Sequence, residues 1–327
     1  MKNSITKINA RLKASSTHTY TKYQLRRFFD EHRSNGEIPS NLSFASFVGK
    51  ILKHEYLELV SIEPLRLPKE KGKPPYRTYD LYIHKKALPL NIALALRPGG
   101  YLSHATAAEH HGLLPPGDRI YANKEQSVKA PNDRSLSQEG IKRAFASAAR
   151  ETNLIYGYQE KHIYLVGGKN SDDYEVRDAI ASNGTKIRVT SLERTLVDLA
   201  VRPIYAGGAR HVVSAYRKAV DEVSIASLIQ ILKKLDHAYP FHQTLGFYLE
   251  RAGASRVATK PLHEMNLTYD FYLDNKIKKP NHDPYWKIYY PPELDEGPAP
   301  PIPKSPAQKN SGRRMKTSIP RPSRGST

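Results

Sequence analysis

The sequence of 327 residues contains no cysteine, so disulfide bonds and thiolate metal ligands are excluded. No apolar run reaches the roughly 18 residues that a membrane-spanning helix needs, and the first residues, MKNSITKINARLK, lack the apolar core of a signal peptide. A P-loop, a dinucleotide-binding glycine fingerprint and the nucleophile elbow of hydrolases are also missing. We therefore expect a cytoplasmic protein that makes no membrane contact and carries no cofactor.

Positive charge, by contrast, is abundant and gathers at the two ends of the chain. The net charge is +19. Residues 1–86 hold 17 lysines and arginines against 8 acidic residues, whereas residues 87–294 hold 27 against 22. The final segment, residues 295–327, holds 7 against 2. Basic terminal segments favour a polyanionic partner, most simply nucleic acid, although a basic and merely soluble protein is the simpler alternative.

After a polar lead-in, two helices are predicted near the N-terminus. Thr21 and Gln24 form a capping box at the start of the first helix, which ends near Gly36. Ser43 caps the second helix, whose apolar stripe recurs at helical spacing. That stripe comprises Phe44, Phe47, Val48, Ile51 and Leu52. The opposite, polar face comprises Ser43, Ser46, Lys50 and Lys53.

Two strands are predicted next, over residues 56–64 and 76–84, and a lysine-rich turn joins them. Helix, helix, strand, basic turn and strand is the order of a winged helix-turn-helix, in which one helix enters the major groove and the turn follows the phosphate backbone. On this interpretation the polar face of the second helix contacts base edges or nearby phosphates. The turn contacts phosphates through Lys69, Lys71, Lys73 and Arg77. Each feature taken alone also fits an ordinary solvated surface.

The predicted fold class is α+β, with three regions along the chain. Residues 1–86 form the winged helix-turn-helix, and residues 87–294 form a larger mixed α/β domain. Helices and strands do not alternate strictly in that domain, so a doubly wound sheet is not expected. Residues 295–327 are rich in proline, serine and basic side chains, and we expect a disordered tail because they offer too few apolar groups to form a core.

Three histidines lie beside a serine and a glutamate in RPGGYLSHATAAEHHGLL, residues 97–114. His104 and His111 are two helical turns apart, roughly 10 Å along the axis, which is too far for the two to hold one tetrahedral ion easily. A catalytic pair of Ser103 and His104 is also disfavoured, because adjacent helical residues point about 100° apart. We therefore expect a structural role, in which Ser103 caps a short helix and the histidines bond neighbouring elements, with no metal ligand and no catalytic residue.

The stretch TSLERTLVDLAVRP predicts a helix with a capping box made by Thr190 and Glu193. Arg194 and Asp198 lie four residues apart and can form an ion pair along that helix. A concave polar surface is expected beside Arg194. The other residues that would form it are Arg202, Gly207 and Gly208.

A metal-dependent nuclease is the alternative class of function. Asp270, Asp274 and Lys276 in DFYLDNK resemble the acidic and D-x-K residues of metal-dependent nucleases. Such an enzyme also needs an upstream acid held against the metal, and the triplet arises often by chance. A third alternative is a protein that binds nucleic acid through its basic ends without sequence preference.

Three segments together resemble the AbiEi-type antitoxins: PGGYLSHATAAEHHGLL, TSLERTLVDLAVRPIYAGG and the region from YPFHQTLGFYLERAG to WKIYYPPEL. The resemblance extends from about residue 20 to residue 294. The matching motif positions are Ser103, His104, His111, Gly112, Glu193, Arg194, Thr195, Asp198, Arg202, Pro203, Gly207 and Gly208.

The resemblance implies a protein that is not an enzyme and has two linked roles. A winged helix would repress its own operon by binding operator DNA with inverted repeats. The second domain would counteract a nucleotidyltransferase toxin of the AbiEii type, in a type IV manner that need not involve stable binding of the toxin. The implied setting is abortive infection, a defence against phage. The long basic tail departs from the compact pattern of the family.

Overall fold

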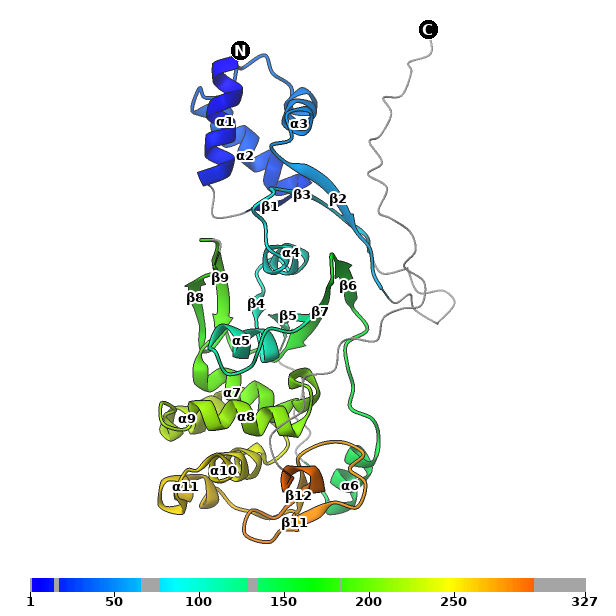
Figure 1. Ribbon diagram of the computed structural model, residues 1–327, viewed down its shortest axis with the longest axis vertical. Coiled ribbons are helices and arrows are strands. Elements are labelled where there is room, and N and C mark those ends of the chain that lie inside the picture. Colours follow the sequence, from blue (N-terminus) through cyan, green and yellow to red (C-terminus); the bar gives the residue numbers. More distant parts are fainter. Residues whose placement is uncertain (1, 15–17, 66–76, 129–134, 183, 297–327) are drawn as a thin grey trace.

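The computed structural model describes residues 2–14, 18–65, 77–128, 135–182 and 184–296. The fold is mixed α+β, as the sequence predicts. Figure 1 shows an elongated molecule built as a stack of layers, with the N-terminal helices at one end, strands in the middle and a group of helices at the other end. The predicted turn lysines and the predicted basic tail beyond Glu296 lie outside the described residues.

The N-terminal unit contains three helices and a three-stranded antiparallel sheet. Its elements are α1 (Lys2–Ala14), β1 (Thr19–Thr21), α2 (Lys22–Ser34), α3 (Phe44–Lys53), β2 (Glu58–Ile62) and β3 (Tyr79–Ile83). The strand order is β1-β3-β2, so the two predicted strands pair with each other and the short β1 is added on the far side of β3. The helices pack their apolar faces together, chiefly through Leu25, Phe29, Phe47 and Ile51.

Local sequence signals account for α2 and α3, but not for α1. The capping box of Thr21 and Gln24 begins α2, and the side chain of Ser43 accepts a hydrogen bond from the backbone N–H of Ser46 at the start of α3, both as predicted. The predicted polar lead-in is instead helical. It buries Ile8 and Leu12, which lie one turn apart, against the same core as α2.

A six-stranded mixed sheet forms the middle of the molecule. Its strands are β4 (Tyr101–Leu102), β5 (Arg119–Glu125), β6 (Ile155–Tyr158), β7 (Lys161–Gly168), β8 (Val176–Ile180) and β9 (Lys186–Thr190), in the order β6-β7-β5-β4-β9-β8. The pairs β5–β7 and β4–β9 are parallel. Alternate residues of β5 and β7 face two different cores, so both faces of the sheet are covered.

Helices lie on both sides of this sheet. They are α4 (Pro89–Leu96), α5 (His104–His110), α6 (Gln138–Ala146), α7 (Leu192–Val201), α8 (Ala209–Ala219), α9 (Ile225–Leu235), α10 (Phe241–Ala252) and α11 (Arg256–His263), with the short turns η1 (Pro203–Ala206) and η2 (Pro292–Leu294). In Figure 1, α4 lies between the two sheets, and α7 to α11 form layers on the opposite side of the larger sheet.

A small third sheet closes the C-terminal end. Its strands are β10 (Phe271–Tyr272), β11 (Asn281–Asp283) and β12 (Ile288–Tyr290), in the order β10-β12-β11. Trp286 comes from the turn before β12 and is 1% exposed. It packs directly over Gly246 in the middle of α10, where a β-carbon would overlap the indole ring. A glycine inside this helix is therefore explained by packing.

The N-terminal sheet packs against the second unit. One core contains Ile62 and Leu81 together with residues of α4 and of the six-stranded sheet. The backbone N–H of Leu65 donates to the carbonyl of Ile155 at 2.8 Å, and the hydroxyl of Tyr156 donates to the carbonyl of Arg77 at 3.1 Å. Leu65 and Arg77, which border residues 66–76, are thus both bonded to β6. The domain boundary after residue 86 stays a prediction.

Among the described helices, none is both long and apolar enough to span a membrane.

Candidate functional site

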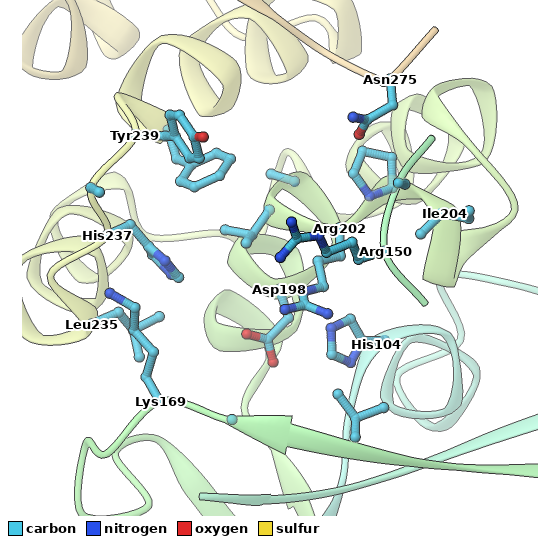
Figure 2. Close-up of a pocket in the computed structure, with 18 of the residues that line it drawn as sticks. His104, Arg150, Lys169, Asp198, Arg202, Ile204, Leu235, His237, Tyr239 and Asn275 are labelled. Atoms are coloured by element: carbon cyan, nitrogen blue, oxygen red, sulfur yellow. The ribbon is translucent and has the colours of Figure 1, made fainter. Parts of the chain in front are cut away.

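A cavity of about 710 Å³ lies beside α7, where segments distant in the sequence meet. Its walls come from the end of β7, the C-terminal half of α7, the chain after α6, the loop between α9 and α10, and the residues after β10. Figure 2 shows Asp198 and Arg202 in the centre of the cavity wall, with Tyr239, His237 and Lys169 together on one side of them. The cavity brings together His104, Arg194, Asp198 and Arg202, which the sequence analysis singled out in two separate motifs.

Arg194 and Asp198 form a buried ion pair at the wall of this cavity. The Nε of Arg194 donates to Oδ1 of Asp198 at 3.1 Å, and their side chains are 3% and 10% exposed. The guanidinium also donates to the carbonyl of Tyr174 at 2.8 Å and lies 4.0 Å from a carboxylate oxygen of Glu125. Oδ2 of Asp198 is buried and has no hydrogen-bond partner among the described residues. One acceptor of a cavity-lining carboxylate therefore has no donor among the described residues.

His104 occupies an unusual backbone conformation, with φ of +52°. Its Nδ1 lies 2.8 Å from the hydroxyl of Ser103. The prediction that neighbouring residues would point apart is wrong here, because it assumed a right-handed backbone at His104. Ser103 does precede the first residue of α5, but its side chain makes no capping hydrogen bond, contrary to prediction. The hydroxyl of Ser103 instead forms a hydrogen bond with the imidazole of His104.

The imidazole of His104 is buried against aromatic rings. Its centroid lies 5.0 Å from that of Tyr205 in an edge-to-face arrangement and 5.9 Å from that of Tyr121. Burial lowers the pKa of His104 to about 4, so the ring is neutral at pH 7. A second cavity histidine, His237, also has a pKa lowered to about 4, by burial and then by the nearby charge of Lys169. Both rings therefore contribute neutral polar groups.

Exposed cations line the outer part of the cavity. Arg150, Lys169 and Arg202 are exposed residues from three different segments. The Nζ of Lys169 donates to the carbonyl of Asp236 at 2.6 Å, and the guanidinium of Arg202 lies 5.6 Å from the ring centroid of Tyr205. Burial raises the pKa of Asp274, which also lines the cavity. This surface is suited to an anionic group.

Other motif residues hold the surrounding elements together. Nε2 of His111 lies 2.7 Å from the carbonyl of Thr190, which links α5 to β9 and confirms the predicted bond between elements. Thr195 bonds the hydroxyl of Thr190 at 2.7 Å. The capping box predicted from Thr190 is wrong by one residue, because Ser191 accepts the hydrogen bond from the N–H of Arg194.

Two further motif predictions have local outcomes. Glu193 was predicted to complete the cap of α7, but its carboxylate instead accepts a hydrogen bond from the N–H of Ser224 at 3.3 Å. Gly207 and Gly208 have φ of +88° and +102° and connect η1 to α8. They line a separate, smaller hollow of about 200 Å³. The predicted concave surface therefore joins Arg194 to Arg202 but does not include the glycines.

The predicted DNA-contacting residues lie at the other end of the molecule. Ser43 and Ser46 are exposed and their hydroxyls are 2.9 Å apart, while Lys50 is half-buried and Lys53 exposed on the same helix. Arg77 is exposed, and its guanidinium lies 5.7 Å from the ring centroid of Tyr79. Lys69, Lys71 and Lys73 fall outside the described residues.

The residues of the nuclease alternative have ordinary local partners. Asp270 lies 2.7 Å from Nε2 of His282 at the surface, and Asp274 accepts a hydrogen bond from the N–H of Asn275 at 2.8 Å. The N–H of Lys276 donates to the carbonyl of Phe145. Across residues 2–296, leaving out the short gaps given above, no three histidine, aspartate or glutamate side chains are grouped so that they could hold a metal ion.

Sequence reasoning missed Arg150, Lys169 and His237. None of them belongs to a regular helical or strand pattern, since each lies on a connecting segment. The only sequence signal near Lys169 is the glycine pair that ends β7. It indicates that the chain turns there, but it does not indicate that Lys169 lines a cavity.

Comparison with known proteins gives one fold-level finding. No known family model matches the sequence, and no curated protein matches it. The structure is similar to the crystal structure of the RV2827C protein from Mycobacterium tuberculosis, with a TM-score of 0.51 and 16% sequence identity, over 88% of this chain and 91% of that chain. At this identity the likeness concerns the fold alone.

Proposed function

We propose that this protein is a sequence-specific DNA-binding autorepressor that also acts as an AbiEi-type antitoxin. The observation that carries the DNA-binding part is the arrangement of the N-terminal unit, in which three helices are followed by the antiparallel pair β2–β3, with β1 on the far side of β3. This is the arrangement expected of a winged helix-turn-helix. The charge of residues 1–86 gives it the sign needed to bind phosphates.

In this proposal α3 is the helix that enters the major groove. Ser46, Lys50 and Lys53 recur at i, i+4 and i+7, so they share one face of α3. That face lies about a third of a turn from Phe47 and Ile51, which are buried in the N-terminal core. Arg77 and the turn lysines serve as phosphate contacts, which add affinity with little sequence information.

The antitoxin part rests on the family resemblance. The functional partner is a nucleotidyltransferase toxin of the AbiEii type in an abortive-infection system, and the antitoxin acts without catalysis of its own. The convergence of His104, Arg194, Asp198 and Arg202 at one cavity gives these motif residues a shared location in the second unit. Co-expression with such a toxin tests this part, because an antitoxin restores growth.

Gel-shift titrations test the DNA-binding part. The full-length chain is titrated with DNA from upstream of its own gene and with random duplex, at several salt concentrations. Changing Lys69, Lys71 and Lys73 together to alanine should make the negative slope of log K against log salt shallower by up to about 2.7, because each phosphate contact contributes about −0.9. Lys50→Ala should change the sequence preference, because that side chain lies on the proposed groove-facing surface of α3.

Lys233→Ala is the matched control, because Lys233 is an exposed lysine on α9 at the other end of the molecule. It should leave both the slope and the preference unchanged. Equal affinity for upstream and random DNA at physiological salt would contradict the autorepressor proposal. It would favour binding without sequence preference through the basic ends of the chain.

A further inference from the structure

We propose that the cavity beside α7 binds a nucleotide, a ligand that combines phosphate groups, hydroxyl groups and a flat aromatic base. This role does not depend on DNA binding by the N-terminal unit. The cavity volume of about 710 Å³ lies within the range of about 300–1,000 Å³ that is typical of small-molecule sites.

The phosphate groups are assigned to the exposed cations. Arg150, Lys169 and Arg202 come from three separate segments and all line the same cavity. Guanidinium and ammonium groups are the side chains that proteins use most to bind phosphate oxygens. Arg194 is less suited to this role, because its side chain is only 3% exposed and its guanidinium is held by Asp198 and by the carbonyl of Tyr174.

The hydroxyl or amino groups of the nucleotide are assigned to the buried acceptors. Oδ2 of Asp198 and Oδ1 of Asn123 both belong to residues that line the cavity, and neither has a hydrogen-bond partner among the described residues. Buried acceptors without a donor are uncommon in folded proteins. Sugar hydroxyls and exocyclic amino groups donate hydrogen bonds, whereas fully ionised phosphate only accepts them, so these atoms favour a ligand with more than phosphate.

The base is assigned to the aromatic side of the cavity. Phe145, Tyr239 and Tyr272 line it and are all half-buried, so part of each ring remains accessible. Phe145 stacks on Tyr272 with centroids 5.6 Å apart and meets Tyr239 edge-to-face at 5.7 Å, which holds the three rings in place. Aromatic rings that are fixed in this way provide stacking surfaces for any base, because every base has a flat aromatic face. Figure 2 shows Tyr239 and Lys169 on the same side of the cavity, with His237 between them.

Isothermal titration calorimetry with the full-length protein tests the proposal. The probes are ATP, GTP, CTP and UTP, with inorganic triphosphate and adenosine as partial ligands. We expect at least one nucleotide to bind at least tenfold more tightly than either partial ligand, because only a nucleotide engages the cations, the acceptors and the rings together. Arg150→Ala and Lys169→Ala should each weaken that nucleotide at least tenfold, and both residues are exposed, so folding is expected to be retained.

Controls separate this proposal from the one for DNA binding. Lys233→Ala removes an equal charge outside the cavity, and Lys50→Ala weakens the proposed DNA surface, and both should bind the nucleotide as the unchanged protein does. Asp198→Asn, checked by circular dichroism for folding, should weaken the nucleotide and leave the binding of triphosphate unchanged.

Three results would overturn the proposal. The first is the absence of nucleotide binding at millimolar concentration. The second is inorganic triphosphate binding as tightly as any nucleotide, which would make the cavity a simple anion site. The third is a bound nucleotide whose affinity is unaffected by both Arg150→Ala and Lys169→Ala, which would place the binding site elsewhere.

Discussion

Two helices of this protein carry the same ion pair at the same spacing and in the same order. On α2, Arg26 contacts Asp30 at 3.0 Å, and on α7, Arg194 contacts Asp198 at 3.1 Å. The side chains on α2 are 52% and 49% exposed, whereas those on α7 are 3% and 10% exposed. The N-terminal pair lies in water, and the pair in the second unit forms the wall of a cavity between the large sheet and the C-terminal helices.

The difference in burial changes what the pair does. An exposed pair contributes about 0–1 kcal/mol, because water already solvates both charges. A buried pair places two desolvated charges against each other, so removing one partner leaves the other charge without compensation. The N-terminal unit therefore keeps this pair at the surface, where it stays solvated. The second unit uses its charges to shape an internal site.

Replacing the two aspartates gives the largest expected effect. Asp198→Ala should lower the free energy of unfolding by about 3–5 kcal/mol, because the guanidinium of Arg194 would stay buried without its carboxylate. Asp30→Ala should lower it by less than about 1 kcal/mol. Urea denaturation of both variants measures the contrast. Equal losses would mean that burial does not distinguish the two pairs.

The pH dependence of stability gives the second effect. The pKa of His104 is about 4 in the folded protein and 6.5 in the unfolded chain, so the unfolded chain takes up the proton first as pH falls. Stability should therefore be lost between pH 6.5 and pH 4, by ~3 kcal/mol for His104 at the acid end. His104→Asn should remove this share, and asparagine tolerates the left-handed backbone at that position.

The measured quantity is the difference in the free energy of unfolding between His104→Asn and the unchanged protein, followed as a function of pH. Burial raises the pKa of Glu109 to about 7, so that group has the opposite effect, losing stability as pH rises from 4.5 to 7. It is present in both proteins and cancels in the difference. His237 also contributes a loss of stability as pH falls, and this contribution is the same in both proteins. A variant whose stability changes with pH just as the unchanged protein's does would contradict the assignment to His104.

Two glycines inside helices give the smallest effect and opposite signs. A β-carbon at Gly49 on α3 would meet nothing within 4 Å, whereas one at Gly246 on α10 would overlap the ring of Trp286. Gly49→Ala should stabilise the protein by about 0.5–1 kcal/mol through the better helix propensity of alanine. Gly246→Ala should destabilise it by about 1–3 kcal/mol through overpacking. Thermal unfolding of both variants would show whether the signs differ.

The sequence predicted the elements whose signals are local. The caps of α2 and α3 follow from short patterns and are confirmed. It missed α1, whose composition is polar overall although two apolar residues anchor it to the core. It also missed α11, which contains Pro261 and therefore breaks the usual rule for helix interiors.

For the candidate site, the sequence predicted parts but not their assembly. It placed Arg194 and Arg202 on one concave surface, and both line the cavity. It treated Ser103 and His104 as pointing apart, because it assumed a right-handed helical backbone, whereas His104 is left-handed. It had no means to add Arg150 and Lys169, which line one cavity although they lie on separate connecting segments.

The sequence by itself determined the capped helices α2 and α3, the distribution of charge and the two motifs of the second unit, because caps, periodicity and composition act over a few neighbouring residues. Only the tertiary structure decided which Arg–Asp pair is solvated and which is buried, and which cations share a cavity. Those properties depend on contacts between segments far apart in the chain, and burial changes the energy of a charge far more than its neighbours in sequence do.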